Sequence, residues 1–153
     1  MNIVIVGAGK IGSALAKYLV DEGHSITVVE RNPERVSRIS TSLDVMTVCA
    51  SADIDSLKLA GAEEADLLIA ATNSDESNIL CCLVARKLGA KNTVARVRQE
   101  DHFREVLFLE KELGLSLVIN PELACANEIS RVLRFPSATQ VDTFAGDRAE
   151  LVE

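Results

Sequence analysis

Short apolar runs recur along the chain and alternate with segments in which apolar residues repeat at the spacing of an amphipathic helix. Each run has the length of a β-strand and consists mostly of β-branched or other apolar residues, which favours a strand. The helical spacing is clearest after the first run, from Ile11 to Leu19, and after the fourth, from Ile79 to Leu88. The six predicted strands cover residues 2–6, 25–29, 45–48, 67–71, 93–97 and 115–119.

The regular alternation of these strands and helices predicts the fold class. Continuous apolar strands are typical of a parallel sheet buried on both faces, and right-handed crossovers place the connecting helices on both sides. We therefore predict an α/β fold, a Rossmann-like doubly wound parallel six-stranded sheet with strand order 3-2-1-4-5-6. In such a sheet, ligands bind at the carboxyl ends of the strands, where the strand order reverses.

A last helix is predicted over residues 122–134. Asn120 is a favourable capping residue, Pro121 suits the first helical turn, and Glu122 complements the positive end of the helix. The apolar positions of this helix form a stripe that a sheet already flanked by helices does not fully cover, so we predict an interface with a partner surface. The stripe consists of Leu123, Ala126, Ile129, Val132, Leu133 and Phe135.

Three glycines follow the first predicted strand in the stretch GAGKIG. At this point of a strand-turn-helix unit, the first glycine permits a tight turn, the second lacks the side chain that would block a pyrophosphate, and the third lets the helix approach the sheet. The N-terminus of the helix offers free amides and a positive dipole to phosphate oxygens. The residues predicted to hold the phosphates of a nucleotide are Gly7, Ala8, Gly9, Lys10, Ile11 and Gly12.

An acidic residue stands where the nucleotide's sugar would lie. Glu30 ends the second predicted strand, 18 residues after Gly12, where a carboxylate accepts hydrogen bonds from the adenosine ribose hydroxyls. Its charge would repel a 2′-phosphate, which favours NAD(H), ATP or ADP over NADP. Arg31 keeps the alternative open, because an arginine at this point can receive that phosphate.

A second polar segment, residues 71–78, follows the fourth predicted strand on the other side of the point where the strand order reverses. Its first residues, Ala71, Thr72 and Asn73, are predicted to line the nucleotide crevice. A capped helix start, with Ser74 or Asp75 as the cap, explains the segment equally well, and both interpretations can hold together. Arg96, near the end of the fifth predicted strand, either reaches the site or has a structural role.

Composition narrows the class of protein further. With 153 residues and 48% hydrophobic content the chain can bury one core, and no apolar run reaches the roughly 18–20 residues that a membrane span needs. We therefore predict a cytoplasmic chain without direct membrane insertion. A net charge of −7 and an aromatic content of 3% disfavour a nucleic-acid partner.

Neither the cysteines nor the candidates for proton transfer indicate a metal, redox or catalytic site. Cys49, Cys81, Cys82 and Cys125 lack the CxxC spacing of a zinc or redox site, so they are predicted to be reduced packing residues, and no metal site is assigned. The groups able to move a proton are poorly placed: His24 precedes the second strand, His102 is expected away from the carboxyl ends of the strands, and Tyr18 lies on the first helix with Glu22 four residues later. No catalytic residue is assigned, and a bound nucleotide is expected to act as a signal.

Five stretches of the chain carry a family resemblance. In order and spacing, GAGKIGSALAKYL, VVERNPERV, AGAEEADLLIAATNSDESNILCCLVARKLG, TVARV and VINPELACANEISRVLRFP resemble the nucleotide-binding N-domains (KTN or RCK N-domains) of TrkA-type potassium-uptake regulators. The resemblance covers residues 1 to about 136. It implies a Rossmann-like nucleotide-binding domain over 1–136, and a linker into a truncated smaller C-terminal lobe over 137–153.

The resemblance assigns roles to single residues. The three glycines match the phosphate loop, Lys10 stands where the family often has arginine, and Glu30 matches the ribose acid. The segment from Thr72 to Asn78 matches the crevice segment of the family, and Arg96 matches its arginine on the fifth strand. The chain departs from the family at Cys49 and Ala50, where many relatives have a Gly-Asp pair at the adenine end of the site.

The resemblance also implies a function and partners. The expected protein is a regulatory subunit of a Trk/Ktr-type potassium uptake system, which binds NAD(H) or ATP/ADP and adjusts transport through a membrane potassium-translocating subunit. It is expected at the inner face of the cell membrane through this partner, as a dimer assembling to a larger ring through helix 122–134. Two alternatives stay open: the cofactor domain of a small NAD-dependent oxidoreductase, and a purely structural dimerisation domain. A full-length protein that continues into a β-rich lobe would favour the regulator, and a larger domain with a catalytic base would favour the oxidoreductase.

Overall fold

The computed structural model describes residues 1–134, 141–144 and 149–152 of the chain. They fall into two compact units, Met1–Asn120 and Pro121–Glu153. The first unit contains a six-stranded sheet flanked by helices, and the second contains one helix and a two-stranded ribbon.

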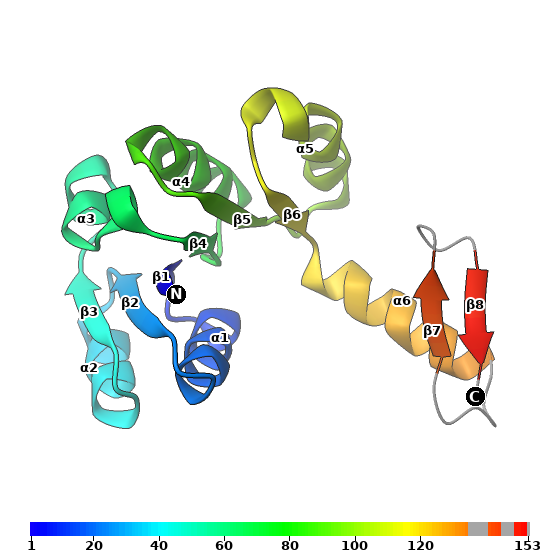
Figure 1. Ribbon diagram of the computed structural model, residues 1–153, viewed down its shortest axis with the longest axis horizontal. Helices are drawn as coiled ribbons and strands as arrows, with labels where there is room; N and C mark the ends of the chain where they lie inside the picture. The colour runs from blue at the N-terminus through cyan, green and yellow to red at the C-terminus, as the bar shows by residue number, and fades with distance from the viewer. Residues whose placement is uncertain (135–140, 145–148, 153) are drawn as a thin grey trace. The chain divides into compact units, whose positions relative to one another are not determined.

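All six strands of the first unit are parallel, and their order is β3-β2-β1-β4-β5-β6 (Figure 1). The predicted fold class and strand order are therefore confirmed. The strands are β1 (Asn2–Val6), β2 (Ser25–Glu30), β3 (Met46–Cys49), β4 (Leu67–Ala70), β5 (Asn92–Arg96) and β6 (Leu117–Ile119).

Helices cover both faces of this sheet (Figure 1). Residues of β1 alternate between two cores: Ile3 and Ile5 pack with α1 and α2, whereas Val4 and Val6 pack with α3, α4 and α5. A strand buried on both sides must be apolar at every position, which explains the continuous apolar runs. The helices are α1 (Lys10–Asp21), α2 (Pro33–Ser42), α3 (Ile54–Leu59), the 3₁₀ turn η1 (Ala62–Glu64), α4 (Asp75–Leu88) and α5 (Glu100–Leu113).

The last predicted strand begins two residues too early. Leu115 is buried, but its amide donates to the carbonyl of Glu110, 3.1 Å away, and so closes the end of α5. In the sequence, an apolar residue that closes a helix end has the same pattern as the first residue of the strand that follows. β6 therefore starts only at Leu117.

The second unit contains α6 (Pro121–Arg134), β7 (Val141–Phe144) and β8 (Ala149–Val152). The predicted last helix is confirmed, and β7 and β8 pair antiparallel. Phe135 of the predicted apolar stripe lies outside the described residues. The division of the chain into 1–136 and 137–153 remains a prediction.

The four cysteines differ in burial. Cys81 and Cys82 are buried in α4, and burial raises the pKa of the Cys81 thiol to about 12 and raises that of Cys82 as well. Both are therefore protonated packing residues, as predicted. The packing prediction is wrong for Cys49 and Cys125, which are exposed: Cys49 ends the edge strand β3, and no residue of α6 is buried.

Within the described part of the chain, no helix has the length and apolar character needed to cross a membrane.

Candidate nucleotide-binding site

The glycine loop, residues 7–12, joins the carboxyl end of β1 to α1. Gly7 has a φ of 100°, which disfavours other residues, and its amide donates to the carbonyl of Val29 at 2.8 Å. A Cβ atom on Gly12 would lie 1.8 Å from the Gly7 carbonyl oxygen, so α1 crosses the loop at a distance that only glycine permits. The fold therefore requires glycine at positions 7 and 12, whether or not a ligand binds.

Gly9 differs from the other two glycines. Its φ of −74° is accessible to any residue, and a Cβ atom there would meet no atom within 4 Å. Gly9 precedes α1, whose N-terminus has no side-chain cap and no acidic residue in its first turn. The loop thus leaves an open approach to amides at the positive end of a helix, the arrangement that binds phosphate groups.

The carboxylate of Glu30 lies directly beside this loop. One of its oxygens accepts the Ala8 amide at 2.8 Å, the other accepts the Asn32 amide at 2.9 Å, and the Arg35 guanidinium lies 3.7 Å away. Burial alone would raise the pKa of Glu30, but the amides of Asn32 and Ala8 and the charge of Arg35 lower it below its usual range. At neutral pH, Glu30 is therefore ionised and acts only as an acceptor, which suits hydroxyl groups of a sugar.

Beyond Glu30, a hollow of about 820 Å³ opens between the ends of β1, β2 and β3 and the helices α3 and α4. Val6 and Val29 line it with apolar surface, and Arg31, Ala50 and Asp53 line it as well. This combination of apolar surface and few polar groups suits a flat aromatic base. Of the predicted pair at the adenine end, Ala50 lines the hollow and Cys49 does not.

The crevice segment from Thr72 to Asn78 lies on the other side of the glycine loop. The backbone of Ala71 and Thr72 lies 3.1 Å from the position of a Cβ atom on Gly7. Ser74 caps α4 by accepting the Ser77 amide at 3.1 Å, so the capping interpretation holds for Ser74. The structure thus brings the glycine loop, Glu30, Ala50 and Thr72 to one edge of the sheet.

Comparison with known proteins decides the family. Residues 3–121 match the family model described as the TrkA-N domain. The chain belongs to the TrkA-N domain family. It is 38% identical over 154 residues to a "Trk system potassium uptake protein TrkA homolog" of Archaeoglobus fulgidus, which matches all of this chain and 35% of the relative. The chain thus spans about a third of the length of this relative.

Solved structures share the fold of this TrkA-N domain. The TrkA-N domain of the inner membrane protein ybaL from Escherichia coli superposes with a TM-score of 0.76 at 23% identity, over 86% of this chain and 96% of that one. The GsuK channel bound to NAD superposes with a TM-score of 0.65 at 24% identity, over 77% of this chain and 21% of the channel. GsuK bound to ADP gives the same TM-score and identity, over 78% of this chain and 31% of that one.

Asn78 of the TrkA-N domain is fully buried, and its carboxamide is saturated by the protein. Its oxygen accepts the amide and the hydroxyl of Thr72 at 2.9 and 2.6 Å, and its nitrogen donates to the carbonyls of Arg96 and Thr72 at 2.8 and 3.3 Å. Arg96 also donates to the Thr72 carbonyl at 3.3 Å. Both residues therefore hold the end of β4 against the end of β5 and fix the position of Thr72.

Asp75, one of the two predicted caps of α4, also joins two strand ends at this edge. Its buried carboxylate accepts the amides of Arg98 and Gln99, each at 2.9 Å, and Arg98 donates back to the Asn73 carbonyl at 2.5 Å. Asn120 donates to the Arg98 carbonyl at 2.9 Å. The only signal in the sequence was an acid in the first turn of a helix, which has a simpler explanation as a capping residue.

The predicted position of His102, away from the carboxyl ends of the strands, is wrong. His102 lies in the first turn of α5, directly after β5, and its Nδ1 atom is 3.9 Å from the Glu76 carboxylate in the first turn of α4. Because both helices begin at the carboxyl edge of the sheet, His102 lies on that edge and not away from it. Tyr18 is exposed on α1, and His24 lies before β2, 3.6 Å from Glu22. Among the residues that the structure describes, no three His, Cys, Asp or Glu side chains gather to hold a metal ion.

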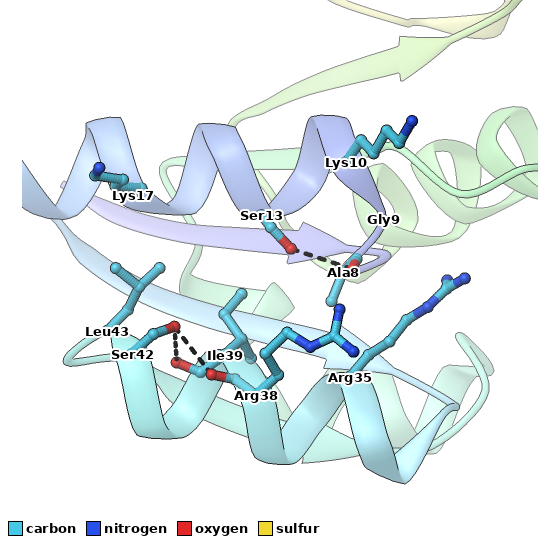
Figure 2. Close-up of a pocket in the computed structure, with 10 residues that line it drawn as sticks. All are labelled: Ala8, Gly9, Lys10, Ser13, Lys17, Arg35, Arg38, Ile39, Ser42 and Leu43. Carbon is cyan, nitrogen blue, oxygen red and sulfur yellow. Dashed lines mark hydrogen bonds between the residues drawn. The ribbon is translucent and has the colours of Figure 1, made fainter.

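A second hollow, of about 510 Å³, opens between α1 and α2 next to the glycine loop (Figure 2). We call it the basic groove, since four of its ten lining residues are cationic. It is lined by Ala8, Gly9, Lys10, Ser13, Lys17, Arg35, Arg38, Ile39, Ser42 and Leu43.

Proposed function

We propose that this TrkA-N domain binds NAD(H), or alternatively ATP or ADP, as a signal that regulates potassium uptake through a membrane protein. The observation that carries the proposal is the ionised Glu30 carboxylate beside an open glycine loop, since the pair combines a ribose acceptor with a phosphate site. The family match and the name of the Archaeoglobus relative support a role in potassium uptake. The NAD and ADP named in the two GsuK structures support the ligand class.

In this proposal each part of the nucleotide meets a different element. The phosphates lie over Gly9 and the amides that begin α1, the ribose hydroxyls donate to Glu30, and the adenine enters the hollow lined by Arg31 and Ala50. The second half of a dinucleotide extends toward Ala71, Thr72 and Asn73. Because Thr72 is held by Asn78 and Arg96, a ligand that touches this turn acts on the ends of β4 and β5 together.

Glu30→Ala tests the nucleotide site. We expect calorimetric affinity for NADH and ADP to fall by about 1.5–3 kcal/mol, the contribution of hydrogen bonds to a charged group. Glu112→Ala, at an exposed position of α5, is the matched control and should bind normally. Because Glu30 also accepts the amides of Ala8 and Asn32, circular dichroism of the Glu30→Ala variant verifies that it is folded before its affinity is measured.

An unchanged affinity of a folded Glu30→Ala variant would place the ribose elsewhere. NADH should be recovered unoxidised after prolonged incubation with the full-length protein. Steady oxidation of NADH with a small carbonyl substrate, if it were lost in the Glu30→Ala variant, would refute the role of NADH as a signal. It would support the alternative, an oxidoreductase.

We further propose that the domain assembles with itself through α6 and acts at the inner face of the membrane through its transport partner. Along α6, Ile129 and Val132 are each 55% exposed and Leu133 is 71% exposed. An apolar stripe of this kind marks a contact surface when it lies on a helix.

Ile129→Glu or Val132→Glu is expected to convert a dimer into monomers in light scattering, because each would place a charge inside an apolar contact. Asn127→Glu, at an exposed polar position of the same helix, should leave the dimer intact. A wild-type protein that is already monomeric at high concentration would refute the proposed interface.

A further inference from the structure

The basic groove concentrates positive charge on an acidic protein. The chain has a net charge of −7, yet the groove is lined by Lys10, Lys17, Arg35 and Arg38 and by no acidic residue. The hollow beyond Glu30, in contrast, is lined by one arginine and two aspartates. The charge of the basic groove is therefore a local property of α1 and α2.

The cations of the groove come from both helices: in Figure 2, Arg35 and Arg38 extend from α2 toward α1, whereas the ends of Lys10 and Lys17 point away from α2. On α1, Lys10 and Lys17 are seven residues apart, and on α2, Arg35 and Arg38 are three residues apart, so each pair shares one face of its helix. Arg35 and Arg38 are neighbours on α2, and like charges at this spacing are destabilising. An anion bound beside both guanidinium groups would offset their repulsion.

Most of this charge has no partner within the protein. Arg35 lies 3.7 Å from Glu30. The side chains of Lys10, Lys17 and Arg38 make no hydrogen bond or ion pair with any residue in the described part of the chain.

The remaining lining residues narrow the chemistry of a ligand. Both hydroxyl protons are committed to backbone carbonyls, Ser13 to Ala8 at 3.1 Å and Ser42 to Arg38 at 2.9 Å. Ile39 is buried at the floor. The free side-chain donors of the groove are thus charged, which disfavours a sugar or an amine and favours an anion. A phosphate group fits best, because the guanidinium forks of Arg35 and Arg38 match its oxygens.

We propose that the basic groove binds a phosphate group, as an anion site next to the nucleotide crevice. The phosphate belongs to a separate molecule, for which inorganic phosphate is the probe, because the ionised Glu30 carboxylate beside Ala8 and Arg35 would repel the 2′-phosphate of a bound dinucleotide. The proposal therefore does not rest on the proposed nucleotide function.

The test uses the full-length protein and the double variant Lys17→Gln/Arg38→Gln. Neither side chain contacts Glu30, and neither belongs to the glycine loop. The matched control is Lys87→Gln/Lys111→Gln, which removes the same charge from exposed positions of α4 and α5 on the other face of the sheet. Circular dichroism verifies that all three proteins are folded.

Inorganic phosphate is titrated at low ionic strength by ³¹P NMR, and NADH and NADPH are titrated by calorimetry. For a separate molecule, we expect phosphate affinity to fall at least tenfold in the groove variant and not in the control, with an unchanged ratio of NADPH to NADH affinity. A wild type that binds NADPH at least as tightly as NADH, together with a groove variant that loses at least tenfold in affinity for NADPH alone, would overturn the assignment of the groove to a separate molecule. The proposal is also overturned if the groove variant matches the wild type in phosphate binding. Since the phosphate titration needs no dinucleotide, a failure of nucleotide binding is distinguishable from a failure of the groove.

Discussion

The Gly9→Val variant is expected to lose at least about 100-fold in affinity for NADH and ADP while it folds normally. The side chain would stand where the phosphates approach the amides of α1, and the loss of two charge-assisted hydrogen bonds costs about 3 kcal/mol or more. The protein itself tolerates the valine, because φ at Gly9 is −74° and a Cβ atom there meets no atom within 4 Å. We expect the free energy of unfolding to change by no more than about 1 kcal/mol.

Calorimetric titration and urea denaturation of the same preparation measure the two quantities. Gly9→Ala is the graded control, since a single methyl group obstructs the approach less than the branched side chain of valine. Normal binding of NADH by a folded Gly9→Val protein would mean that the phosphates do not pass over the glycine loop.

The Gly12→Ala variant is expected to show the opposite behaviour, with a loss of about 3 kcal/mol or more in the free energy of unfolding. The new Cβ atom would lie 1.8 Å from the carbonyl oxygen of Gly7, so α1 and the loop would have to separate. Gly7 cannot move away easily, because its own φ is 100° and the backbone of Ala71 and Thr72 lies 3.1 Å from the position that its Cβ atom would take. Overpacking of this kind costs about 1–3 kcal/mol and more where the backbone must shift.

Urea denaturation of Gly12→Ala and Gly9→Ala compares one added methyl group at two positions of the same loop. Only the variant at position 12 should be strongly destabilised. Equal stability of the two variants would contradict the close crossing of α1 over Gly7.

The sheet could be predicted from the sequence because its parallel strands are buried on both faces. Ile3 and Val4 belong to opposite cores, and both must be apolar, so β1 is visible as an uninterrupted run. The crevice could be predicted for a different reason. The turn, the helix crossing and the carboxylate each require a particular residue type, and these types are visible as the spacing of the glycines and their distance from Glu30. The use of the site by a nucleotide remains a prediction.

The side-chain network of the crevice could not be predicted, because it joins residues that are adjacent only in the folded sheet. Asp75 and Arg98 are 23 residues apart in the sequence, and they meet because β4 and β5 are neighbours. The same adjacency brings His102 to Glu76. The exposure of Cys49 depends on β3 being the edge strand, which a local pattern of apolar residues does not reveal.

The hydrogen bonds of Asp75, Asn78 and Asn120 cross-link the carboxyl edge of β4, β5 and β6. Three consecutive strand ends are cross-braced by side chains, from the Thr72 turn through Arg98 to Asn120. Asn120 is the last residue of the first unit. The network of side chains therefore reaches from the Thr72 turn to the point of the chain at which the first unit ends.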